Sequence, residues 1–129
     1  MATELTMLAW SVLLGFVYIF ATSTVVTRER GMKWNASARD GDAKPVSPLA
    51  GRLQRAPANF LETAPVFAAA AIAVVLAGRG NYTTALAAQA YFWARVVYLP
   101  LYAAGVPYVR SLVWAVSLLS ILALVFALL

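Results

Sequence analysis

The sequence predicts an all-α integral membrane protein in which four transmembrane helices pack as a bundle. Of its 129 residues, 63% are hydrophobic and 12% are charged, whereas a soluble domain carries about twice that share of charge. The mean hydropathy is +0.78. The apolar runs are long enough to cross a bilayer as helices, and their composition gives no sign of the alternating pattern of a membrane barrel. We expect a single domain, residues 1–129.

The first apolar run predicts a helix over about residues 5–27, with no charge inside the run. A signal peptide is the alternative interpretation. It fits less well, because Glu4 stands where a basic segment is expected and the run is longer than a typical signal-peptide core.

The second helix is predicted over about residues 48–77. Ser47 and Pro48 have the pattern of an N-cap followed by proline at the first helical position. Pro57 and Pro65 lie inside this helix, and each favours a kink because proline removes a backbone hydrogen bond.

The third helix is predicted over about residues 82–105 and the fourth over about residues 109–129. The connection at residues 78–81 is tight, so the second and third helices should be antiparallel neighbours. Runs of small residues at 68–71 and 85–90 let helices approach closely in lipid. A four-helix protomer this short has little interior of its own, so we expect an oligomer.

The distribution of charge predicts the orientation in the membrane. The formal net charge is +5, and most basic residues lie between the first two apolar runs, as in the cytoplasmic loops of membrane proteins. We therefore expect a multi-pass protein of the cell inner membrane, with both termini away from the cytoplasm. The clustered charge suits lipid head groups and argues against nucleic acid as a partner. The basic residues of this loop region are Arg28, Arg30, Lys33, Arg39, Lys44, Arg52 and Arg55.

The residue types that are missing limit the chemistry. The chain has no cysteine and no histidine. This excludes thiol nucleophiles, disulfides, thiolate or imidazole metal sites, bis-histidine haem and histidine general bases, so no metal site is expected. Any chemistry must use other polar side chains or come from a ligand.

Two polar stripes interrupt the apolar helices. Each stripe occupies one helical face, because its members recur at intervals of three or four residues. The stripe of the second helix consists of Arg52, Arg55, Asn59 and Glu62. The stripe of the third helix consists of Arg95, Tyr98 and Tyr102.

Arg95 is the most unusual residue of the two stripes. An arginine at the centre of a membrane helix costs roughly 2.5–3.5 kcal/mol on insertion scales, so it should face a partner, a cavity or a ligand. Counted from the cytoplasmic helix ends, Glu62 and Arg95 lie at overlapping depths of roughly 21 and 15 Å. We therefore expect these two side chains to pair. The alternative is that the pair only neutralises two charges and locks helix packing.

The surplus of arginine predicts an acidic ligand. In the cytoplasmic half of the bundle, three arginines face the single carboxylate of Glu62. Guanidinium binds carboxylate in bidentate fashion, and an amide and two tyrosines add neutral donors. The inventory fits a small, multiply acidic ligand that enters from the cytoplasm.

Two segments carry a resemblance to a known family. Residues 52–65, RLQRAPANFLETAP, resemble the second-helix signature of the MAPEG family, the membrane-associated proteins in eicosanoid and glutathione metabolism. Residues 94–103, ARVVYLPLYA, resemble the third-helix signature. Length, four spans, a basic first loop and a short second loop also agree. The chain looks like a prokaryotic-type member that is similar to microsomal glutathione transferases.

The resemblance implies a homotrimer that binds glutathione, as co-substrate, between neighbouring subunits. Glu62 would accept from the amino group of glutathione, the arginines would hold its carboxylates, and the tyrosines would line the peptide. One subunit would supply the stripe of the second helix and its neighbour that of the third. The implied binding residues are Arg52, Arg55, Asn59, Glu62, Arg95, Tyr98 and Tyr102.

The implied activity is that of a glutathione transferase or peroxidase acting on lipophilic electrophiles. Nearby positive charge lowers the pKa of a thiol toward neutrality, and the thiolate would attack an electrophile dissolved in the bilayer. Family enzymes activate the thiol with an arginine, and Arg110 is the nearest match. Its spacing from Tyr102 is about one residue shorter than in the prostaglandin synthases.

The same residues suit two other functions. A non-catalytic binding or scaffold protein would use the same intersubunit pocket for a lipid or another anionic ligand. A small proton-coupled exporter would need Glu62 to titrate, and the surplus of arginine argues against that.

Overall fold

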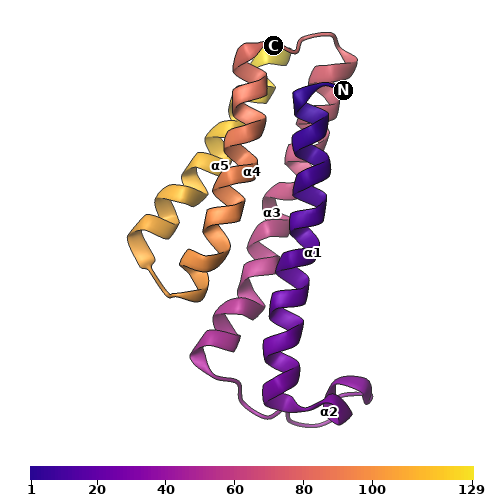
Figure 1. Cartoon of the computed structure of the whole chain (residues 1–129), viewed down its shortest axis with the longest axis vertical. Coiled ribbons are helices and arrows are strands. Elements are labelled where there is room, and N and C mark those ends of the chain that lie inside the picture. Colours follow the sequence, from indigo (N-terminus) through magenta and orange to yellow (C-terminus); the bar gives the residue numbers. More distant parts are fainter.

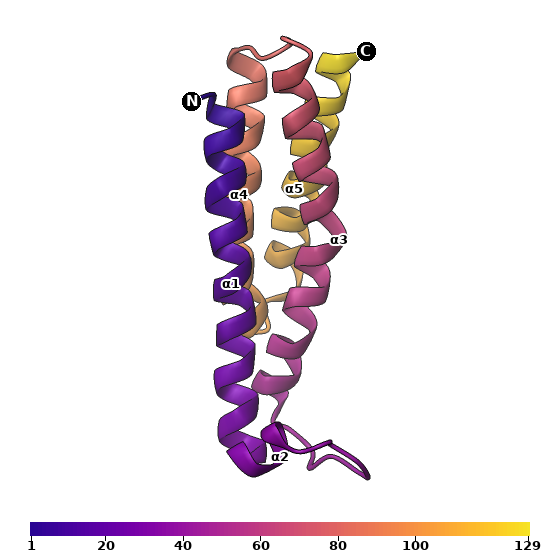
Figure 2. The same ribbon diagram turned by 90° about the vertical axis from the view of Figure 1, so that its right-hand side faces the viewer.

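The computed structural model covers residues 1–129 and is entirely α-helical (Figure 1). Its long helices lie side by side, α1 against α3 and α4, and α5 against α3 and α4. Both termini lie at one end of the bundle and the short helix α2 at the other (Figures 1 and 2). The elements are α1 (Thr3–Arg30), α2 (Met32–Ala36), α3 (Pro48–Leu76), α4 (Tyr82–Ala103) and α5 (Pro107–Leu128).

Three of the helices, α1, α3 and α5, are long and apolar enough to cross a membrane. The prediction of an all-α integral membrane protein is thus confirmed. Helix α4 has the same length as α5, 22 residues, but it carries Gln89 and Arg95 and is not apolar enough to be counted with these three. Its status as a fourth span remains a prediction.

The connection between the first two long helices differs from the polar loop expected there. Helix α1 continues to Arg30, beyond the expected end near residue 27. Arg28 and Arg30 lie in its last turn, where cations offset the negative end of the helix dipole. Gly31 ends the helix at φ 92°, a backbone conformation that glycine adopts readily. The five residues of α2 follow directly.

Helix α3 begins as the sequence predicts, with a cap at Ser47. The Oγ atom of Ser47 accepts a hydrogen bond from the backbone N–H of Ala50 at 3.2 Å. The N–H and the hydroxyl of Ser47 each donate to the carboxylate of Glu29 at 2.6 Å. This link fixes the start of α3 to the end of α1. The helix continues through Pro57 and Pro65.

Helix α4 begins at a capping box. The Asn81 side chain accepts from the N–H of Thr84 at 2.9 Å, and the Thr84 hydroxyl accepts from the N–H of Asn81 at 2.8 Å. The same hydroxyl donates to the buried carboxylate of Glu4 at 2.6 Å. The start of α1 is thereby joined to the start of α4.

The interior consists of two apolar clusters at different heights. The cluster nearer the termini includes the stacked rings of Phe67 and Tyr91, whose centroids are 4.0 Å apart. The Tyr91 hydroxyl is 2.9 Å from the Thr63 hydroxyl, a buried hydrogen bond between α3 and α4. The cluster nearer α2 surrounds the polar stripes and contains Tyr18, Ala56, Phe60 and Tyr98.

Candidate functional site

Arg95 is fully buried inside the protomer, at 0% exposure. Its Cζ atom lies 4.4 Å from the ring centroid of Tyr98, 5.6 Å from that of Phe60 and 6.0 Å from that of Tyr18. The Tyr18 hydroxyl also donates to the Arg95 carbonyl at 2.6 Å. Aromatic faces attract a cation most strongly where water is excluded. The three rings therefore stabilise the buried guanidinium of Arg95.

The guanidinium of Arg95 bonds to Asn59. Its Nη2 donates to Asn59 Oδ1 at 2.8 Å, while Nε and Nη1 have no hydrogen-bond partner. Within the protomer, therefore, the expected Arg95–Glu62 pair does not form. Glu62 is exposed. It lies three residues beyond Asn59, about 4.5 Å further along the axis and about 60° round the helix, which takes its side chain off the face that meets Arg95.

Nearer the α2 end, arginines converge on Tyr102. The Arg55 Nε donates to the Tyr102 hydroxyl at 3.1 Å. The Cζ atom of Arg110, at the start of α5, lies 5.0 Å from the Tyr102 ring centroid. The Arg52 Nε donates to the carbonyl of Ala103 at 3.0 Å, where a cation meets the negative end of α4. We call Arg52, Arg55 and Arg110 the arginine cluster.

The two tyrosines of α4 differ in accessibility. Tyr98 is buried and its hydroxyl makes no hydrogen bond within the protomer. Tyr102 is half-buried, and its ring centroid is 5.4 Å from that of Tyr98. Arg95 and Tyr98 therefore offer no open surface to a ligand in this protomer, whereas Arg55 and Glu62 do.

One chain thus brings together most of the residues expected at the site. The stripes of α3 and α4 meet through Asn59–Arg95 and Arg55–Tyr102 within a single protomer. The groups that accept hydrogen bonds from Arg52 and Arg55 are a backbone carbonyl and a tyrosine hydroxyl, and neither is a carboxylate. Guanidinium groups without a paired carboxylate can receive an anion through charge-assisted hydrogen bonds.

A second polar surface, not identified from the sequence, lies between α1, α2 and α3. It is a pocket of about 300 Å³ whose lining includes Ser23, Thr27 and Gln54. Arg39 adopts φ 59° at its rim, and its Nη2 donates to Asn35 Oδ1 at 2.6 Å. In the sequence, the one indication of this pocket was Gln54. It lies between Arg52 and Arg55 of the stripe, but it faces α1.

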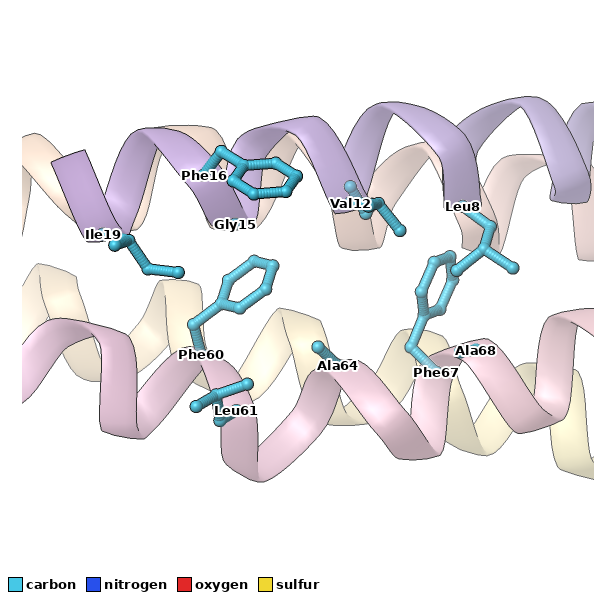
Figure 3. A pocket seen from close by; sticks show the side chains of 11 residues that line it. Leu8, Val12, Gly15, Phe16, Ile19, Phe60, Leu61, Ala64, Phe67 and Ala68 are labelled. Atoms are coloured by element: carbon cyan, nitrogen blue, oxygen red, sulfur yellow. The ribbon is translucent and has the colours of Figure 1, made fainter.

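An apolar cleft of about 250 Å³ continues from this pocket along α1 and α3 (Figure 3). Ile19 lines both the pocket and the cleft. Ser11 also lines the cleft, and its buried hydroxyl has no partner. Phe60 joins the cleft to the core, since its ring also lies beside the Arg95 guanidinium.

The comparisons with known proteins give one match. A family model described as "MAPEG family" matches residues 7–129. No curated protein and no solved structure matches the chain.

Proposed function

The chain belongs to the MAPEG family of membrane proteins in eicosanoid and glutathione metabolism, and from this premise we propose that it is a glutathione transferase or peroxidase that acts on lipophilic electrophiles. The observation that carries the proposal is the arginine cluster beside Tyr102, which has no paired carboxylate. Glutathione has two carboxylates, an amino group and a thiol. Arginine forks suit the carboxylates.

The roles follow from which side chains are accessible. Arg52 and Arg55 bind the glutathione carboxylates, and the exposed carboxylate of Glu62 accepts from the amino group. Tyr102, which already accepts a hydrogen bond from Arg55, lines the peptide, and the buried Tyr98 packs behind its ring. With these groups bound, the thiol of glutathione lies beside Arg110. The nearby positive charge lowers the pKa of the thiol and so favours the thiolate.

The work of the site is positioning and electrostatics. The thiolate attacks an electrophile that arrives from the bilayer, and the proton of the thiol leaves to water. Fixed positive charge in a site that excludes water stabilises the developing anion without reorganisation. The apolar cleft along α1 and α3 provides a surface for the lipophilic partner.

The proposed assembly is a homotrimer in which all four long helices cross the membrane. Arg55 and Glu62 are exposed on the protomer, so one chain alone would leave much of a bound peptide open. In a trimer, the polar pocket of one subunit, with Ser23, Thr27 and Arg39, would cover the arginine cluster of the next. Native mass spectrometry in detergent should give three chains per particle; a monomer would contradict the shared site.

Isothermal titration of the purified protein with glutathione tests the proposal. We expect saturable binding that weakens at least tenfold, about 1.4 kcal/mol, in Arg55→Ala. Arg79→Ala is the matched control, because Arg79 is exposed in the connection between α3 and α4, at the opposite end of the bundle. Absence of saturable binding by the wild type would refute the proposal.

A non-catalytic lipid-binding or scaffold protein is the second candidate. The largely apolar cleft along α1 and α3 favours it, since an acyl chain fits such a surface. This candidate predicts ligand binding without thiolate absorbance in the ultraviolet, and without conjugation of glutathione to a chlorodinitrobenzene-type electrophile. Turnover of that electrophile would exclude it.

A further inference from the structure

We propose that Arg95 is a positioning residue that acts through Asn59, by turning the Asn59 carboxamide so that its N–H₂ group faces bound glutathione. The inference rests on the proposed function and deepens it. Arg95 was expected to touch the ligand itself. In this account it does not, and Asn59 is the group through which it affects binding.

The orientation of Asn59 follows from the chemistry of its partner. Arginine carries only hydrogen-bond donors, so the atom of Asn59 that meets Arg95 Nη2 must be the carbonyl Oδ1. The amide nitrogen then points away from Arg95. It donates to no group of the protomer, and Asn59 is half-buried, at the edge of the accessible surface.

The neighbours of Asn59 on the helix indicate which groups its amide nitrogen can meet. Arg55 and Glu62 lie one turn to either side of Asn59 along α3, both rotated from it toward the exposed side of the helix. An N–H₂ donor held between them meets a carboxylate or a peptide carbonyl of the ligand. If the amide were turned over, Asn59 would present its carbonyl oxygen, an acceptor, to the ligand. Its N–H₂ group would then face the Arg95 guanidinium, so that two donors would meet inside the protein.

Arg95 is built to hold this orientation firmly. Its guanidinium lies among the rings of Tyr18, Phe60 and Tyr98, and its backbone carbonyl is held by the Tyr18 hydroxyl. A hydrogen bond from a charged donor is stronger than one between neutral groups, so it favours one orientation of the Asn59 carboxamide. At 0% exposure, Arg95 is enclosed by protein and not by ligand.

A purely structural role would make Arg95–Asn59 one more bond between α3 and α4. The protein contains such a bond one turn away, between the buried hydroxyls of Thr63 and Tyr91 at 2.9 Å. It joins the same two helices and involves no member of the proposed site. Tyr91→Phe is therefore a matched control for loss of a buried interhelical hydrogen bond.

The test is a double-mutant cycle on glutathione affinity, measured by titration of the purified full chain. The variants are Arg95→Met, Asn59→Ala and the double variant, with Tyr91→Phe and Asn59→Ala as the control cycle. Methionine fills the apolar cage without a donor. We expect Arg95→Met and Asn59→Ala each to weaken binding about tenfold, and the double variant to bind no more weakly than either.

Additive losses in the Arg95–Asn59 cycle would overturn the inference, as would wild-type affinity in Arg95→Met. The control cycle should be additive. Arg95→Lys keeps a cationic donor and should recover affinity relative to Arg95→Met. Failure of the wild type to bind glutathione would instead contradict the proposed function, so the two failures are distinguishable.

Asn59→Asp is a second route that leaves Arg95 in place. The aspartate keeps an acceptor for Arg95 but has no N–H₂ group, so the thermal midpoint should be retained while glutathione affinity falls about tenfold. Unchanged affinity in Asn59→Asp would show that the amide donor has no role and would refute the inference.

Discussion

At the scale of single residues, the bundle buries two side chains of charged residue types, Arg95 and Glu4. Arg95 is held by three rings and one amide near the α2 end, and Glu4 accepts from Thr84 near the termini. Each has a neutral hydrogen-bond partner. Such partners matter because a buried charge that loses its hydrogen bonds destabilises the fold far more than an exposed one.

Loss of the Glu4 partner should lower stability without changing ligand affinity. Thr84→Val leaves the buried Glu4 carboxylate without the 2.6 Å hydrogen bond and removes half of the capping box. We expect a loss of about 1–3 kcal/mol, seen as a lower thermal midpoint in detergent. Thr83→Val, at the exposed neighbouring position, is the control and should change little. Equal midpoints for the two variants would contradict this role for Glu4.

Arg110 should separate thiol activation from binding. Its guanidinium lies over the Tyr102 ring, outside the hydrogen bonds that hold Arg52 and Arg55. In Arg110→Ala we expect the thiolate absorbance of bound glutathione to disappear and conjugation to fall at least tenfold, while the glutathione Kd changes less. Arg110→Lys should keep part of the absorbance, since a positive charge remains. A full thiolate signal in Arg110→Ala would assign activation to another group.

The proximity of the two polar stripes was more predictable than the contacts between them. The spacing of the stripes placed Arg55, Asn59 and Arg95 near one another, and the structure joins Asn59 to Arg95. Residue counting could not decide whether Asn59 or Glu62 is the partner of Arg95. The two positions along the helix differ by less than one turn, and the predicted helix ends are uncertain by as much. Nor could it show that Tyr18, from a helix distant in sequence, completes the cage of Arg95.

At the scale of elements, the long helices were predictable because the length of an apolar run and the residues that begin or end a helix can be read from a short stretch of sequence. Ser47 and Pro48 start α3 as expected, and Gly105, at φ 74°, follows the end of α4. The five residues of α2 were not predicted, because a single turn in a polar loop has no apolar period. The polar pocket beside it depends on how that loop folds back against α1 and α3.

Gly105 links an element end to the site. A Cβ atom at Gly105 would lie 3.4 Å from the Arg52 Cζ, and the positive φ disfavours any side chain. Gly105→Ala should lower stability by about 1–2 kcal/mol because of the positive φ, while the new Cβ atom meets Arg52 at an ordinary contact distance, so glutathione affinity should be kept. Gly78→Ala is the matched control, with φ 66° and open space around the new Cβ. It should lose similar stability; a much larger loss in Gly105→Ala would show that the contact with Arg52 is strained.

At the scale of the whole molecule, both termini lie at the end opposite α2 and the basic loop (Figure 1). The excess of basic residues at the α2 end predicts that this end faces the cytoplasm. The arginine cluster is near that end, so glutathione would enter from the cytoplasm while the lipophilic partner comes from the bilayer.

The predicted orientation can be measured directly because the chain has no cysteine. Ala2→Cys and Ala43→Cys place single thiols at exposed positions, one at the N-terminus and one in the connection before α3. In right-side-out membrane vesicles, a membrane-impermeant maleimide should label Ala2→Cys at once and Ala43→Cys only after the vesicles are opened. The reverse pattern would invert the topology and place the arginine cluster on the other side.

Above all, we propose that Arg52 and Arg55 of the arginine cluster bind the two carboxylates of glutathione. The most direct test is titration of the wild-type protein with glutathione and, in parallel, with glutathione whose two carboxylates are esterified. Glutathione should bind saturably, and the diester should bind at least a hundredfold more weakly, a difference of about 2.8 kcal/mol. Equal affinity for the two molecules, or no saturable binding of glutathione, would contradict the account.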